Sequence, residues 1–165
     1  AVKETKVTLT GFAQPGMSIK LYVNGPEKAE AVVDGEGIFT LSDVKLINGR
    51  NTVYAKTVDQ YGNESDKSQT YTIQVDSKSP LLTVDEPKDG ETIKNLNGRI
   101  QIKGKVSEKA TVAINDRMVI QRPDFTFEYL LGVESGNITI KIKAVDEAGN
   151  SAEKEIKVKY EKESD

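Results

Sequence analysis

The chain has 165 residues, and its 23 Lys and Arg against 26 Asp and Glu give a net charge of −3. It contains no Cys, His or Trp, which excludes disulfides, the ordinary zinc, haem and iron–sulfur sites, and any mechanism that needs an imidazole base. The lysines form no basic stripe, so nucleic acid is not an expected partner, and no apolar run is long enough to predict a transmembrane segment.

Alternating apolar and polar residues predict short antiparallel strands along the whole chain. In chain order, the alternation occurs at residues 7–9, 19–23, 53–55, 71–75, 100–102, 112–114, 140–142 and 156–160. Turn signals rich in Gly, Asn, Asp and Pro separate these segments. No segment has a helical period, so the predicted fold class is all-β.

The two halves of the chain form an internal repeat. Residues 52–63 (TVYAKTVDQYGN) match residues 139–150 (TIKIKAVDEAGN), and the flanking segments match in the same order. Repeats of this length are whole small domains. We therefore predict two tandem immunoglobulin-like β-sandwiches of about seven strands each, domain 1 at residues 1–76 and domain 2 at residues 77–165.

The two domains are expected to differ at their first strand. A lead-in segment before the second repeat predicts an extra strand at residues 81–84, and Pro87 ends it. The first repeat lacks most of this lead-in, so the first strand of domain 1 is expected to be abbreviated or truncated. Three phenylalanines in matching strands are expected to be core residues because each small sandwich needs large inward side chains; they are Phe39, Phe125 and Phe127.

One pattern runs through both repeats: L-x-x-G-x-N-x-φ-x-φ-x-A-x-D-x-x-G-N, where φ is apolar. It extends from Leu46 to Asn63 and, with small departures, from Val133 to Asn150. The pattern resembles tandem bacterial immunoglobulin-like domains of Gram-positive surface and secreted proteins, and the second repeat is most similar to the glucodextranase domain B type. Thr57 departs from the family, which prefers Ala there. The resemblance implies a spacer, a stalk or an adhesive arm, because this fold carries many functions.

Two equivalent turns hold the candidate metal ligands, which are Asp59 with Asn63 and Asp146 with Asn150. An Asp before an x-x-Gly-Asn turn can accept backbone N–H groups across the hairpin, which is a structural role. The alternative is Ca²⁺, a hard cation that takes about six to eight oxygen ligands. A stronger form of that alternative adds Asp76 or Asp85 beside a turn of the neighbouring domain. Calcium is the one cofactor that the sequence suggests.

Tyr22 and Tyr54 are the candidate ligand-binding residues. Alternation places both on the outer face of neighbouring strands in one sheet. Their rings are expected either to form an aromatic platform for carbohydrate or to make a cross-strand pair that covers the sheet. The lack of Trp, and of aromatic residues at the matching positions of the second repeat, favours the pair.

The sequence predicts a structural protein rather than an enzyme. No pair of carboxylates is singled out for catalysis, and neither sandwich has residues to spare for a substrate cleft. We expect a non-catalytic spacer segment of a larger bacterial cell-surface or secreted protein, located outside the cell. The alternatives are a carbohydrate- or cell-wall-binding module and an adhesin arm, which would use an exposed apolar patch or an open edge strand. The expected partners are other domains of the parent chain, a cell-wall polysaccharide or a surface protein.

Overall fold

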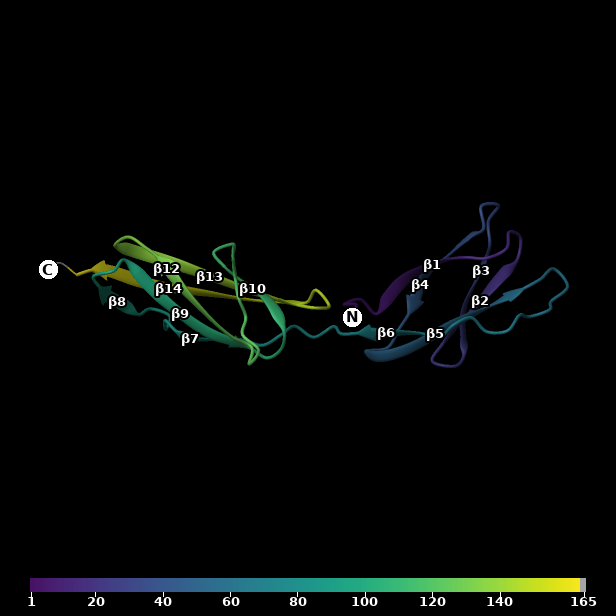
Figure 1. The fold of residues 1–165 in the computed structure, drawn as a ribbon, viewed down its shortest axis with the longest axis horizontal. Helices are drawn as coiled ribbons and strands as arrows, with labels where there is room; N and C mark the ends of the chain where they lie inside the picture. The colour runs from purple at the N-terminus through teal and green to yellow at the C-terminus, as the bar shows by residue number, and fades with distance from the viewer. Residues whose placement is uncertain (164–165) are drawn as a thin grey trace. The chain divides into compact units, whose positions relative to one another are not determined.

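A computed structural model describes residues 1–163, and its regular elements are all β-strands (Figure 1). The chain divides into two compact units, Ala1–Ser77 and Lys78–Asp165, called unit 1 and unit 2 below. Each unit has two sheets that enclose an apolar core. No helix among the described residues is long and apolar enough to cross a membrane.

Unit 1 contains six strands in the part of the chain that the structure describes: β1 (Lys6–Phe12), β2 (Ser18–Val23), β3 (Glu27–Val32), β4 (Ile38–Lys45), β5 (Gly49–Val58) and β6 (Tyr71–Val75). One sheet has two strands in the order β1-β4, and the other has four in the order β3-β2-β5-β6. Ile19, Leu21 and Val23 of β2 are buried, as their alternation predicts. At the start of the chain, Val2 forms a parallel bridge with Val75.

Unit 2 contains eight strands among the described residues: β7 (Leu82–Glu86), β8 (Thr92–Asn95), β9 (Arg99–Val106), β10 (Ala110–Ile114), β11 (Arg117–Val119), β12 (Thr126–Gly132), β13 (Gly136–Asp146) and β14 (Ser151–Lys162). The sheets have the orders β12-β9-β7 and β11-β10-β13-β14-β8, and β8 is parallel to β14. The extra strand predicted before the second repeat is confirmed as β7, and the peptide bond that follows it, Glu86–Pro87, is cis.

The strand numbers differ from the predicted seven because the lead-in before the second repeat forms two strands. β7 pairs with β9 in one sheet, and β8 pairs with β14 in the other. Unit 1 has only the Val2 bridge in the place of β8 and no described strand in the place of β7.

The phenylalanine prediction is correct for one residue and wrong for another. Phe127 is 0% exposed in the core of unit 2, whereas Phe125 lies before β12 in a turn, with φ 67°, and is not part of the core. Phe39 is paired with Gly11 as Phe127 is paired with Gly104. Phe39 is therefore the counterpart of Phe127 and not of Phe125.

Candidate functional site

The outer face of β2 and β5 carries the predicted tyrosine pair. Tyr22 and Tyr54 lie opposite each other, and their rings stack with centroids 4.8 Å apart and an interplanar angle of 5°. The ammonium of Lys56 lies 5.8 Å from the centroid of Tyr22, and that of Lys67 lies 5.8 Å from the centroid of Tyr54. Stacked rings cover each other and do not form one flat platform. The geometry supports a cross-strand pair with cation–π contacts; ligand binding by these tyrosines stays a prediction.

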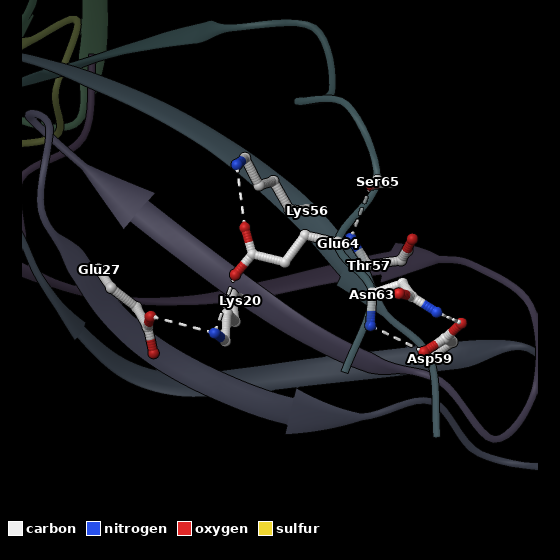
Figure 2. Close-up of polar contacts among 8 residues, drawn as sticks. All are labelled: Lys20, Glu27, Lys56, Thr57, Asp59, Asn63, Glu64 and Ser65. Atoms are coloured by element: carbon white, nitrogen blue, oxygen red, sulfur yellow. Dashed lines mark hydrogen bonds and ion pairs between the residues drawn. The ribbon is translucent and has the colours of Figure 1, made fainter. Parts of the chain in front are cut away.

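A charged cluster lies on the same strands (Figure 2). Lys20 and Lys56 are directly opposite in the register of β2 and β5, an arrangement in which like charges repel. Glu64, from the segment after β5, lies between them. One of its carboxylate oxygens is 3.0 Å from the ammonium of Lys20, and the other is 3.0 Å from the ammonium of Lys56. Glu27 adds a longer contact of 3.9 Å to Lys20. Glu64 therefore neutralises a repulsion that the pairing of β2 with β5 creates.

The ionisation of this cluster follows from its hydrogen bonds. The bonds from Lys20 and then Lys56 hold the pKa of Glu64 below its ordinary value. The bond to Glu64 raises the pKa of each lysine in turn. The role of Glu64 could not be predicted from the sequence, because it depends on a strand register that alternation alone does not determine.

Two serines that follow Glu64 make hydrogen bonds to the backbone along the edge of β5. Ser65 donates its N–H to the Thr57 carbonyl and accepts the Thr57 N–H on its hydroxyl, both at 3.0 Å. Ser68 does the same with Ala55, at 2.8 and 2.9 Å. Hydroxyls thus replace backbone carbonyls along this edge. Regular pairing begins only at β6, whereas in unit 2 β13 and β14 pair along almost their whole length.

The two Asp–Asn turns have the same geometry. One carboxylate oxygen of Asp59 accepts the N–H groups of Tyr61 and Asn63 at 2.8 and 2.9 Å, and the other accepts the Asn63 side-chain amide at 2.8 Å. Figure 2 shows the Asp59–Asn63 pair at the end of β5. Gly62 has a φ of 84°, which a residue without a Cβ adopts readily. Both oxygens of this carboxylate therefore accept hydrogen bonds from within the turn.

In unit 2, Asp146 accepts the N–H groups of Ala148 and Asn150, each at 2.8 Å, and the Asn150 amide at 2.9 Å. Asp146 and Asn150 are buried here, whereas Asp59 and Asn63 are more exposed. The hydrogen bonds expected from the structural interpretation are thus present in both turns. Calcium binding by these residues stays a prediction.

The pKa values of both aspartates are lowered. The side-chain amide and then the backbone N–H of Asn63 are the main reason that the pKa of Asp59 lies below its ordinary value. Burial opposes this effect at Asp146, but the bonds from Asn150 and the turn amides outweigh it, and the pKa of Asp146 is also lowered. Both carboxylates are therefore charged and hydrogen-bonded at neutral pH.

Asn51, the first Asn of the repeated motif, is a fully buried polar residue for which the sequence alone predicted no role. Its side-chain oxygen accepts the Ile47 N–H at 2.9 Å and the Asn24 side-chain amide at 3.0 Å, and its amide donates to the Ile47 carbonyl at 2.8 Å. Asn51 lies two residues before Val53 in β5, so alternation places it inward. It holds the loop between β4 and β5 from inside the core.

Comparisons with known proteins fit this architecture. Residues 80–161 match the family model described as Glucodextranase, domain B. Over 160 residues, the chain is 31% identical to Bacillopeptidase F of Bacillus subtilis (strain 168), covering 94% of this chain and 11% of that protein. The chain also resembles the solved fibronectin(III)-like modules of Clostridium thermocellum CbhA, with a TM-score of 0.59, 13% identity, and coverage of 98% of this chain and 88% of that one. At that identity, the structural likeness concerns the fold alone.

Proposed function

We propose, from the match of residues 80–161 to the glucodextranase domain B family model, that units 1 and 2 are two tandem bacterial immunoglobulin-like domains that act as a non-catalytic spacer. In this proposal the spacer is part of a larger bacterial protein that is secreted or held at the cell surface, and it works outside the cell. Its partners are the other domains of the same parent chain.

One observation carries the proposal: the polar side chains described above make their hydrogen bonds and ion pairs within the chain and so stabilise the fold. The carboxylates of Asp59 and Asp146 close turns, Glu64 neutralises paired lysines, and Asn51 holds a loop. Among the described residues, no buried side-chain nitrogen or oxygen lacks a hydrogen-bond partner. Binding and catalytic sites instead present converging polar groups to a pocket.

The relation to Bacillopeptidase F supports the view that the chain is one module of a longer polypeptide. The chain spans 11% of that protein's length, so the activity of the whole relative is not transferred to it. A module that holds other domains apart needs an apolar core and a hydrophilic surface. Each unit has an apolar core, and 30% of the residues of the chain are charged.

The spacer proposal is tested by replacement in the full parent protein. In one variant, residues 1–165 are exchanged for two unrelated immunoglobulin-like domains of the same length; in the other, they are deleted. The proposal requires the exchange to preserve the activity of the parent at the cell surface and the deletion to reduce it. If the exchange fails as the deletion does, specific residues of this chain are needed and the spacer role is refuted.

A further inference from the structure

The strand β1 of unit 1 is paired on one side only. Its one described partner is β4, whereas its counterpart in unit 2, β9, lies between β12 and β7. The Ala13 N–H donates to the Gly37 carbonyl at 2.9 Å. Because hydrogen-bonded positions alternate along an antiparallel pair, the backbone groups of Thr10 and Phe12 point away from β4. These groups form an open strand edge.

A groove of about 730 Å³ runs along this edge, between β1 and residues 65–73. Inward-facing apolar side chains line it, among them Leu9, Phe39 and Ile73, which belong to the core of unit 1 yet are only partly buried. Tyr71, which also faces inward, is 60% exposed. The core of unit 1 is therefore open to solvent along the side on which β1 lacks a partner.

The same positions are closed in unit 2. Ile102 and Phe127, the counterparts of Leu9 and Phe39, are each 0% exposed, and Ile156, the counterpart of Tyr71, is 3% exposed. The strand that closes them is β7, which pairs antiparallel with β9, while its Leu82 and Val84 pack against the core.

A pair of glycines shows the difference at atomic detail. A Cβ on Gly104 would overlap the Phe127 ring on one side and the Thr83 carbonyl of β7 on the other. A Cβ on Gly11 would overlap the Phe39 ring in the same way, but the close atoms around it all belong to that ring. Unit 1 thus has the counterparts of β9 and Phe127, which are β1 and Phe39. Among its described strands it has no counterpart of β7.

We propose that this groove is a strand-acceptor site, which binds an extended polypeptide segment that pairs antiparallel with β1 and inserts aliphatic side chains at alternate positions. Such strand addition combines main-chain hydrogen bonds with side-chain pockets. The bound segment needs aliphatic side chains at alternate positions, as β7 has in its sequence Leu-Thr-Val-Asp-Glu.

The occupant is the segment that leads into Ala1 in the parent protein. Val2 bridges Val75 in parallel, as Ile93 bridges Tyr160 in unit 2. In unit 2 the chain that enters this bridge comes directly from β7. If the chain enters the Val2 bridge of unit 1 in the same way, the polypeptide before Ala1 lies along the groove. This inference rests on the proposed function in one respect, that the chain is part of a longer protein, and it adds that polypeptide precedes Ala1 in that protein.

The test is amide hydrogen exchange, measured on residues 1–165 and on the parent protein with its natural sequence before Ala1. We expect the amides of Thr10 and Phe12 to exchange at least tenfold more slowly in the parent, while that of Ala13, already bonded to Gly37, changes little. A peptide of residues 79–88 (SPLLTVDEPK) added to residues 1–165 should protect the same two amides. The peptide carrying Leu82→Asp and Val84→Asp is the matched control and should bind about a hundredfold more weakly, because it loses both apolar anchors.

Two results would overturn the proposal. In the first, Thr10 and Phe12 exchange equally fast in the parent and in residues 1–165, whatever the peptide does. In the second, the two amides are protected in residues 1–165 alone, in step with a concentration-dependent doubling of mass, which makes a second copy the occupant. Neither result affects the domain-exchange test of the spacer role, so the two proposals fail separately.

Discussion

Phe39 and Phe127 occupy equivalent places in the two units, and replacing each with alanine measures how far each core is closed. Both rings cover a glycine on the neighbouring strand, Gly11 or Gly104. Phe127 is fully buried beneath β7, whereas Phe39 lines the open groove. The substitution is chemically identical in the two units, so a difference in its effect reports the surroundings.

The expected magnitudes follow from burial. Removing a fully buried Phe costs the transfer of its ring plus a cavity that the core does not fill, about 4 kcal/mol in total. At Phe39 part of the ring is already exposed and water can enter from the groove, so only the buried part of the transfer is lost, about 2 kcal/mol. We therefore expect Phe127→Ala to destabilise unit 2 by about 2 kcal/mol more than Phe39→Ala destabilises unit 1.

Urea unfolding followed by two-dimensional NMR measures both values in the whole chain, because resolved backbone signals report each unit separately. The control is the wild-type chain, from which the midpoint and slope for each unit are taken. Equal losses of free energy in the two units would refute the reasoning, since they would mean that the core of unit 1 is as closed as that of unit 2.

Three further predictions concern the polar side chains. Asn51→Ala should destabilise unit 1 by about 3 kcal/mol, since three short hydrogen bonds are lost, and urea midpoints would show it; a loss below about 1 kcal/mol contradicts this role. Asp59→Asn should lower the thermal midpoint of unit 1 equally in calcium and in chelator, because the carboxylate closes a turn; a loss seen only with calcium present would support the metal instead. Glu64 has a folded pKa below its ordinary 4.5, so its stabilisation is complete above that value and is lost as the pH falls. The midpoint difference between wild type and Glu64→Gln should therefore shrink as the pH falls from about 5 to about 3, and a constant difference would exclude an ionic role.

Much of the fold could be predicted because the physics of each strand is local. The buried face of β2 at Ile19, Leu21 and Val23 follows from a period of two residues, and the lead-in before the second repeat forms β7. The error at Phe125 has the same origin. Phe125 and Phe127 share one alternation phase, but the chain turns at Phe125 with a positive φ, so only Phe127 enters the core.

The remaining contacts depend on register and on loops, which alternation does not determine. Lys20 faces Lys56 only because of one particular pairing of β2 with β5, and Glu64 reaches both from an irregular segment. The sequence indicated a first strand in domain 1 that is abbreviated or truncated. Only the structure shows the consequence, which is that core residues such as Leu9 line an open groove.

The spacer role is tested most directly by a pull-down of the purified chain on insoluble cell wall, cellulose, chitin and starch, with calcium and with chelator. If the chain is a spacer, it remains in the supernatant with every polymer, and a variant with Tyr22→Ala and Tyr54→Ala behaves identically. Retention on one polymer that the double variant loses, while both proteins unfold at the same urea concentration, would contradict the spacer role and identify the stacked tyrosines as a carbohydrate-binding site.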